Sequence, residues 1–598
     1  HRFVVGILTR TDEYGSGASI PRPQPGLLQA GRLRRYFQSG RAPWRIANGA
    51  MGFLTTGAPE TPLDRKVAPP AFRDCVRSAL AGELKREATQ GLASRCPVDS
   101  AECALKSSGV SAAAFLLAGA LAFGAAEPAA AAAAIILIST AFFALAAAVR
   151  IALVLFGLRT SRRERIPPLQ DAELPTVTIL APLFHEAHAL PGLIKAIGAL
   201  DYPAQKLDVK LLLEESDAET LGEARRLHLE EFFDLIIVPP SHPQTKPKAC
   251  NYGLACARGE LIVIYDAEDE PEPAQLRIAA GRFAGAGDRL ACVQARLNYY
   301  NPDENWLTRL FTLEYCLWFD HFLPALDRIG APIPLGGTSN IFRTEILSDV
   351  GGWDPYNVTE DADLGFRLAR RGYQTAIVDS TTFEEANCRL GNWMRQRTRW
   401  MKGFMQTWAV ARRRRNATAF DWRTSLSVDF LVGGAVFSAL LNPVLWALLA
   451  AERLGGTAPL ADLPDWVGGA TLSALAFGNL TLIALAAFAP LRRGLFRLSP
   501  AALLMPAYWV MMSVAAWRAL LQLFLRPSFW EKTEHGLSEM AKGRRRRALK
   551  TFGLEPDGGR GQVSMPGDAA AGRNADRARI NQDDAVRLAI PEDERTRQ

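Results

Sequence analysis

Apolar residues gather in two blocks of this 598-residue chain, near 110–158 and 426–525, and a long mixed region separates them. Within the first block, residues 110–126 and 129–158 are almost wholly apolar and are divided by a Glu-Pro pair. About twenty helical residues cross the hydrocarbon core of a bilayer. The pattern therefore predicts a transmembrane helical hairpin over 110–158.

The second block contains two apolar stretches that are long enough to span a bilayer, 426–451 and 466–490. The short loop between them is acidic, whereas the loop after them carries Arg492, Arg493 and Arg497. Four arginines also follow the first block directly. Because Lys and Arg accumulate on the cytoplasmic side of a membrane, we expect the mixed region and the N-terminus to be cytosolic.

A third apolar stretch, 501–525, is interrupted by Pro506, Arg518 and Gln522. If it crossed the bilayer fully, the basic tail that contains residues 544–547 would lie outside. We therefore predict a re-entrant or interfacial segment that keeps the tail inside. The second block as a whole is assigned to transmembrane and interfacial or re-entrant helices.

The mixed region, 171–410, alternates short apolar runs with helical patterns such as 189–200 and 218–232. The runs are nearly continuously apolar, which is typical of buried parallel strands. They cover residues 177–181, 209–214, 235–238 and 261–266. This alternation predicts an α/β domain whose ligands bind at the carboxyl ends of the strands.

The two ends of the chain are polar. Residues 1–109 contain one helical pattern, 71–93, and are interpreted as a cytosolic extension without an assigned function; 526–598 is interpreted as a charged, partly disordered cytosolic tail. The net charge of +7 is small for this length, and the basic runs lie beside apolar blocks. That placement favours a lipid bilayer over a nucleic acid as partner. The eight cysteines form no C-x-x-C pair, so a zinc or iron–sulfur centre has little support.

Four acidic segments fall at predicted strand or helix ends. They contain Glu186, Asp217, the run Asp266-Ala267-Glu268-Asp269, and the pair Glu360-Asp361. Any one acidic loop is more often a solvated turn. Four that face one crevice predict a binding site.

The run Asp266-Ala267-Glu268-Asp269 directly follows an apolar strand. Mg²⁺ is often held by one or two carboxylates together with substrate phosphates, so the run suits a metal-bound diphosphate. Lys248, and also Lys246, lie just ahead of a predicted helix, where phosphate contact is favourable. The alternative for both lysines is plain surface charge.

Asp361 is the candidate general base. It lies near the start of a predicted helix, where the helix dipole favours the ionised carboxylate. An acceptor hydroxyl needs to lose its proton as it attacks an anomeric carbon. The alternative, an N-capping acid, is compatible with that role.

The segment that ends in Gln396-Arg397-Thr398-Arg399-Trp400 predicts an amphipathic, cationic and aromatic helix just ahead of a membrane span. It suits an interfacial anchor. It also suits a helix under an active site, where Arg399 would meet a diphosphate and Trp400 would present a flat face to a sugar ring.

In this order, the motifs resemble those of family-2 glycosyltransferases of the cellulose synthase and hyaluronan synthase type. The resemblance rests on Pro182-Leu183-Phe184-His185-Glu186, Asp217, Lys248, Asp266-Ala267-Glu268-Asp269, Leu335-Gly336-Gly337-Thr338-Ser339, Thr359-Glu360-Asp361 and Gln396-x-x-Arg399-Trp400. It implies a GT-A fold inserted between transmembrane helices. It also implies an inverting hexosyltransferase that uses a UDP-sugar with Mg²⁺ or Mn²⁺, in the multi-pass setting of a bacterial-type inner membrane. The product would be a β-linked polysaccharide that leaves through the enzyme's own helices.

The resemblance also implies roles for individual residues. Glu186 and Asp217 would hold the uridine, and Lys248 the diphosphate. Asp266 and Glu268 would bind the metal ion and the donor. Because the usual Asp-x-Asp is here Asp-Ala-Glu-Asp, the choice of metal ligand between Glu268 and Asp269 stays open.

The acceptor side is implied in the same way. Gly337 and Thr338 would shape the acceptor site, and Asp361, with Glu360 beside it, would act as the base. The pyrophosphate and acceptor would be held by Gln396, Arg399 and Trp400.

Three alternatives remain at this level. The enzyme could add a single sugar to a lipid carrier or glycan end, or the fold could serve as an inactive scaffold, although the intact acidic motifs argue against the latter. Residues 530–536 could be a gating loop or a solvated linker. The donor sugar, the linkage, the oligomeric state and any export or regulatory partner are not specified by the sequence.

Overall fold

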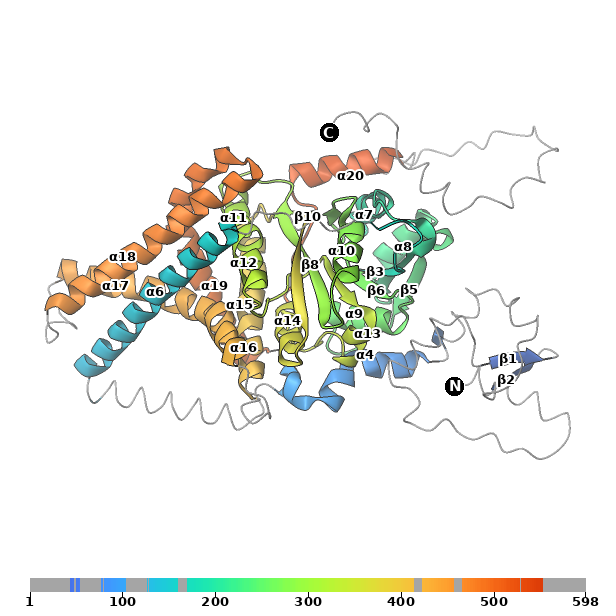
Figure 1. The fold of residues 1–598 in the computed structure, drawn as a ribbon, viewed down its shortest axis with the longest axis horizontal. Coiled ribbons are helices and arrows are strands. Elements are labelled where there is room, and N and C mark those ends of the chain that lie inside the picture. The colour runs from blue at the N-terminus through green and yellow to red at the C-terminus, as the bar shows by residue number, and fades with distance from the viewer. Residues whose placement is uncertain are drawn as a thin grey trace.

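The computed structural model describes residues 44–47, 50–53, 77–78, 80–103, 126, 128–159, 169–413, 422–455, 465–527 and 529–551 (Figure 1). The predicted first half of the hairpin, 110–126, lies almost entirely outside these residues, as does the predicted disordered part of the tail beyond 551. Near the N-terminus, β1 (Trp44–Ala47) and β2 (Ala50–Phe53) form an antiparallel pair.

An eight-stranded mixed sheet forms the centre of the domain between 171 and 410, in the order β5-β4-β3-β6-β9-β8-β10-β7. The strands are β3 (Val177–Leu183), β4 (Leu207–Glu214), β5 (Asp234–Val238), β6 (Leu261–Ile264), β7 (Glu270–Pro271), β8 (Leu290–Tyr299), β9 (Asn340–Arg343) and β10 (Gln374–Glu384). β3 pairs in parallel with β4 and β6, and β4 in parallel with β5. This half confirms the four predicted strands.

The second half of the sheet departs from a purely parallel arrangement. β9 runs antiparallel to both β6 and β8, and β7 antiparallel to β10. The acidic segment after β6 and the loop before β9 consequently meet at one edge of the sheet.

Helices cover both faces of the sheet, as its buried strands require. One face packs on α7 (Leu190–Gly198), α8 (Ala218–Arg226) and α10 (Gln275–Ala284). The other packs on α9 (Lys246–Ala255), α11 (Trp306–Leu317), α12 (Leu323–Arg328), α13 (Thr344–Asp349) and α14 (Glu360–Arg370). The helix predicted over 218–232 ends early, because His228 adopts a left-handed conformation with φ of 52°.

A group of long helices extends away from the sheet on one side (Figure 1). It contains α6 (Pro128–Arg159), α16 (Trp422–Ser427), α17 (Gly434–Gly455), α18 (Asp465–Phe488) and α19 (Met505–Leu525). Within the described residues, four stretches are long and apolar enough to cross a membrane: Ile136–Leu158, Thr424–Ala447, Gly468–Arg493 and Phe496–Leu525. The last of these contains the stretch predicted as re-entrant or interfacial, and that assignment stays a prediction.

Two further helices connect these parts. α15 (Leu390–Arg413) runs from the sheet domain toward the spans and packs along α19. α20 (Glu539–Thr551) follows the spans and returns to pack on α7 (Figure 1). The chain therefore passes from the sheet to the candidate membrane spans and back again.

Candidate active site

A cavity of about 1030 Å³ lies between the sheet domain and the long helices. Its walls come from the loops after β3 and β6, the starts of α9 and α14, the middle of α15, and the segment after α19. Arg150 and Leu153 of α6 and Phe430 ahead of α17 also line it. The carboxyl ends of the strands thus share one cavity with the candidate membrane spans.

The acidic residues after β6 do not all face the cavity. Asp266 and Glu268 line the cavity, whereas Asp269 is 1% exposed and is not among the lining residues. The Asp269 carboxylate accepts a hydrogen bond from the backbone N–H of Asp266, at 2.7 Å, and another from the Thr338 hydroxyl. Asp269 therefore stabilises the turn, and of the two acids Glu268 is the one that lines the cavity, while the choice of metal ligand stays a prediction.

Of the two lysines at the start of α9, only one lines the cavity. Lys248 is 1% exposed, and its ammonium donates to both carboxylate oxygens of Glu214 at 2.8 Å. Lys246 lines the cavity, pairs with Asp266 at 2.5 Å and donates to the Gly337 carbonyl at 2.7 Å. Lys246 is therefore the lysine that faces the cavity, whereas Glu214 holds the Lys248 ammonium outside the cavity lining, and the diphosphate contact predicted for Lys248 stays a prediction.

Only one of the two residues that were predicted to hold the uridine lines the cavity. Glu186 lines the cavity, and burial, with Glu268 nearby, raises its pKa to about 7 against the opposing charge of Lys532. Asp217 is 1% exposed and caps α8 by accepting from the Thr220 N–H. It also accepts from the N–H of His185, whose φ is 53°. Asp217 thus holds the loop that presents Glu186 and is not itself a cavity-lining residue.

The loop ahead of β9 places its small residues close to Asp361, the predicted base. Gly337 and Thr338 line the cavity. A Cβ atom at Gly337 would lie 3.3 Å from Oδ2 of Asp361, which is tighter than most real contacts. The glycine lets this loop approach the candidate base closely.

Glu360 and Asp361 form the first turn of α14 and both line the cavity. Burial, and then the neighbouring Asp361 carboxylate, raises the pKa of Glu360 to about 8. Burial also raises the pKa of Asp361, and the N–H of Ala362 offsets this in part by donating to Oδ1 at 2.8 Å. A carboxylate whose pKa lies nearer neutrality is a stronger base when ionised.

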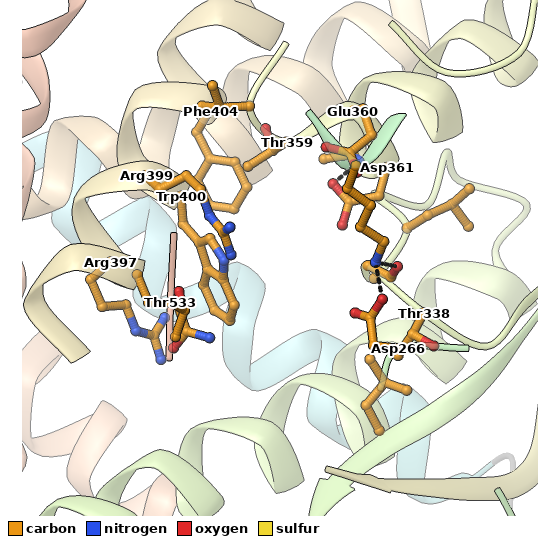
Figure 2. Close-up of a pocket in the computed structure, with 18 of the residues that line it drawn as sticks. Asp266, Thr338, Thr359, Glu360, Asp361, Arg397, Arg399, Trp400, Phe404 and Thr533 are labelled. Atoms are coloured by element: carbon orange, nitrogen blue, oxygen red, sulfur yellow. Dashed lines mark hydrogen bonds and ion pairs between the residues drawn. The ribbon is translucent and has the colours of Figure 1, made fainter. Parts of the chain in front are cut away.

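The α15 residues Gln396, Arg399 and Trp400 line the opposite wall, and Figure 2 shows Arg399 and Trp400 facing Asp361 and Asp266 across the cavity. The buried Nε of Arg399 has no hydrogen-bond partner among the described residues. Such an unmatched donor suits an anionic ligand. Except for Asp217, Lys248 and Asp269, the predicted donor and acceptor residues thus line two walls of one cavity.

Arg397, between Gln396 and Arg399, has a different task. Its guanidinium pairs with Glu314 of α11, donates to the Tyr508 hydroxyl at 2.7 Å, and lies 4.5 Å from the centre of the Trp400 ring. Trp400 also stacks on Tyr315 at 6.4 Å. These contacts fix the orientation of the Trp400 ring.

The segment after α19 lies over the cavity. His535 pairs with Glu268 at 2.6 Å, Lys532 with Glu186 at 3.5 Å, and Trp530 lies 4.6 Å from the Arg399 guanidinium. The segment therefore contacts residues of the cavity, and its role as a gating loop stays a prediction. These contacts span more than a hundred residues of chain, so spacing alone could not have assigned them to the site.

Sequence reasoning also missed Glu384 and Glu385 at the end of β10, which line the same cavity. Glu385 accepts hydrogen bonds from the N–H groups of Gly536 and Ser538 and so holds the segment after α19. The available signal was the adjacent acidic pair in Phe383-Glu384-Glu385. Strand β10 was not among the predicted strands, so the pair had no assigned place.

The residues present fit a divalent cation only in part. Among the described residues, no group of three His, Cys, Asp or Glu side chains is arranged to hold a metal ion. Asp266 and Glu268 nevertheless offer two cavity-facing carboxylates. Mg²⁺ is commonly bound by one or two carboxylates that are completed by substrate phosphates. Of the three acids predicted as candidate metal ligands, Asp266 and Glu268 thus line the cavity and Asp269 does not, and their role as ligands stays a prediction.

Residues 261–528 match a family model described as glycosyl transferase family group 2. The glucomannan 4-beta-mannosyltransferase 2 of Arabidopsis thaliana is 26% identical over 38% of this chain and 45% of its own. The beta-monoglucosyldiacylglycerol synthase of Trichormus variabilis is 24% identical over 47% of this chain and 60% of its own. The chain thus spans about half the length of these curated relatives.

A solved structure of a mannosyltransferase from Pyrobaculum calidifontis, in complex with GDP-Man and Mn²⁺, is 20% identical with a TM-score of 0.41. It covers 64% of this chain and 98% of its own. The family match includes the acids after β6, the start of α14 and all of α15. Residues 261–528 are therefore similar to glycosyl transferase family group 2, and they include the second half of a mixed α/β sheet domain together with helices that are long and apolar enough to span a membrane.

Proposed function

We propose that the protein is a membrane-embedded hexosyltransferase that transfers sugar from a UDP-sugar, with inversion, to a growing β-linked polysaccharide. The observation that carries the proposal is the single cavity shared by Asp266, Asp361 and the spans. An acceptor that reaches the base from the membrane side would meet the donor without leaving this cavity. The catalytic domain would be cytosolic, in the inner membrane of a bacterial-type cell.

The reaction follows from the two walls of the cavity. Ionised Asp361 removes the proton of an acceptor hydroxyl, whose oxygen attacks the anomeric carbon of the donor. The bond between that carbon and the phosphate oxygen breaks as the new glycosidic bond forms, and UDP leaves. One displacement gives one inversion.

The leaving diphosphate gains negative charge that needs compensation. Arg399 and Lys246 lie on the cavity walls as cationic groups for it. Asp266 and Glu268 would hold Mg²⁺ or Mn²⁺, which supplies further positive charge to the diphosphate. Glu186 would contact the uridine, and Gln396 and Trp400 the acceptor sugar.

Repeated transfer is supported by the lining of the cavity, which includes Trp400 together with Leu153 and Phe430 of the candidate spans. A flat indole is a good surface for a sugar ring, and the spans would carry the lengthening product outward. The proposal that this chain forms a polymer is also supported by its similarity to a relative that is named as a glucomannan mannosyltransferase.

A second candidate is the transfer of one sugar to a lipid or glycan end. It is favoured by the apolar residues at the membrane end of the cavity, such as Leu431 and Met512, and by the relative named as a glucosyldiacylglycerol synthase. Donor site and base would be the same in both cases.

The test is a screen of UDP-sugars, UDP-glucose first, with Mg²⁺ or Mn²⁺ and the purified full chain in detergent. Released UDP and product size are measured. We expect UDP release and products of many sugars, whereas a one-sugar adduct would replace the polymer proposal with the second candidate.

The assignment of the base is tested by Asp361→Asn. This variant is expected to lose sugar transfer while it still binds UDP. If it still transfers sugar, Asp361 is not the base.

A further inference from the structure

The segment 81–103, here called the N-terminal brace, packs on the catalytic domain. It consists of α4 (Ala81–Arg95) and the short turns Pro97–Asp99 and Ala101–Cys103. In Figure 1 it lies below the sheet domain, beside α9, α13 and α14. α4 covers most of the helical stretch predicted over 71–93, of which residues 71–76 and 79 lie outside the described part.

The first contact of the brace is with α9, the helix that carries Lys246 at its start. Leu84 and Ala88 of α4 are 0% and 1% exposed and belong to the same apolar cluster as α9. The Asn251 amide of α9 donates to the Ala88 carbonyl at 3.2 Å and to the Trp353 carbonyl at 2.8 Å. The brace is therefore part of the core under the donor side of the cavity.

The second contact is with both ends of α14. Asp99 is 0% exposed and pairs with Arg370 at 3.5 Å and with Arg371 at 3.2 Å, at the carboxyl end of the helix. Ahead of the helix, Asp354 accepts from the Ser100 hydroxyl at 3.1 Å and from the Ala101 N–H at 2.6 Å. Glu360 and Asp361 lie between these two anchor points.

The third contact is with the carboxyl end of α15, the helix that carries Gln396, Arg399 and Trp400. Arg413 donates to the Ser100 carbonyl at 3.0 Å, and Val410 packs against Ala101. One short segment thus touches the three helices that bear Lys246, Asp361 and Arg399.

Charge burial distinguishes such a brace from a loosely attached extension. Asp99 and Asp354 are both 0% exposed. A buried carboxylate is costly unless it is paired or hydrogen-bonded, and here the partners lie more than 250 positions away in sequence. Without the brace, Asp354 and the two arginines would lose these partners, and α14 would lose the contacts that hold it at both ends.

We propose that the N-terminal brace sets the position of α14 relative to α9 and α15, and that Asp99 and Ser100 are positioning residues for the base Asp361. The proposal rests on the proposed function, because it assigns Asp361 the task of the base. It gives residues 81–103 a role in catalysis without contact to substrate. A small misplacement of a catalytic group can cost a large factor in rate.

The test compares Asp99→Asn with Glu102→Gln in the full chain, measuring kcat, KM for the UDP-sugar, UDP binding and Tm. Glu102 is an exposed carboxylate of the same segment and is the matched control. We expect Asp99→Asn to lower kcat by about tenfold or more, with KM and UDP binding within about twofold. The Glu102→Gln variant should match the wild type.

Two results would overturn the proposal: a kcat of Asp99→Asn equal to that of the wild type, or a raised KM with unchanged kcat. If Asp99→Asn does not fold, Ser100→Ala decides in the same way, because it removes one hydrogen bond to Asp354. If the wild-type enzyme releases no UDP from any sugar donor, the proposed function itself is wrong. A failure of the positioning proposal and a failure of the proposed function therefore give different results.

Discussion

Asp361 must be ionised to accept a proton, and its environment works against ionisation. Burial raises the pKa of Asp361. Burial, together with the Asp361 carboxylate, also raises the pKa of the adjacent Glu360 to about 8. Protonation of this acidic pair removes the base, so kcat/KM is expected to fall as the pH is lowered through the range around 8, where Glu360 takes up a proton. The measurement is a pH profile of UDP release at constant metal concentration. A flat profile across this range would contradict the assignment.

The lysines of α9 give a matched pair of substitutions. Lys248→Met leaves the carboxylate of Glu214, which is 4% exposed, without its cation. Breaking a buried pair in this way costs about 3–5 kcal/mol of unfolding free energy. Lys246→Met should instead raise KM for the UDP-sugar and have the smaller effect on stability. Thermal unfolding and donor kinetics on both variants check this, and the reverse pattern would restore Lys248 as the diphosphate ligand.

At the scale of elements, the close approach of α14 and α15 is made possible by a glycine. A Cβ atom at Gly403 would lie 2.3 Å from Oγ1 of Thr359, directly ahead of Glu360. Nothing lies within 4 Å of the corresponding position at Gly391, on the same helix. The base and the Arg399 wall therefore keep their separation only with glycine at 403.

Gly403→Ala is expected to push the two helices apart. Overpacking of this kind costs about 1–3 kcal/mol, and the displaced base should lower kcat by about tenfold or more. Gly391→Ala is the control and should leave kcat unchanged. Equal activity of the two variants, measured as UDP release, would show that the spacing of α14 and α15 is not critical.

At the scale of the whole molecule, the chain leaves the sheet domain through α15, passes through the spans and returns over the cavity. The contacts of Lys532 with Glu186 and of His535 with Glu268 close this path. The donor side, the base and the candidate spans are consequently parts of one assembly.

The membrane end of the cavity gives the prediction at this scale. Ala435, at the start of α17, lines the cavity. Ala435→Trp should narrow it, so that product length or acceptor transfer falls while KM for the UDP-sugar is unchanged. Leu472→Trp, at a position 39% exposed on α18, is the control. Products of wild-type size from Ala435→Trp would exclude this route for the acceptor.

Local patterns determined a large part of this protein. The alternation of apolar runs and helical patterns predicted strands β3 to β6, because β3, β4 and β6 are buried along most or all of their length, although β5 is partly exposed. Apolar stretches predicted helices α6, α17 and α18, and their length and composition suit a membrane. The order of acids and of Gln396-x-x-Arg399-Trp400 indicated a glycosyltransferase domain, which the family match supports.

Tertiary structure decided the remainder. Which lysine faces the cavity depends on Glu214, which of Glu268 and Asp269 faces it depends on Thr338, and the place of residues 81–103 depends on Asp354. Each of these partners lies far away along the chain. Periodicity and spacing report only near neighbours in sequence, whereas the direction of a side chain and the burial of a charge are set by groups that the fold alone brings into contact.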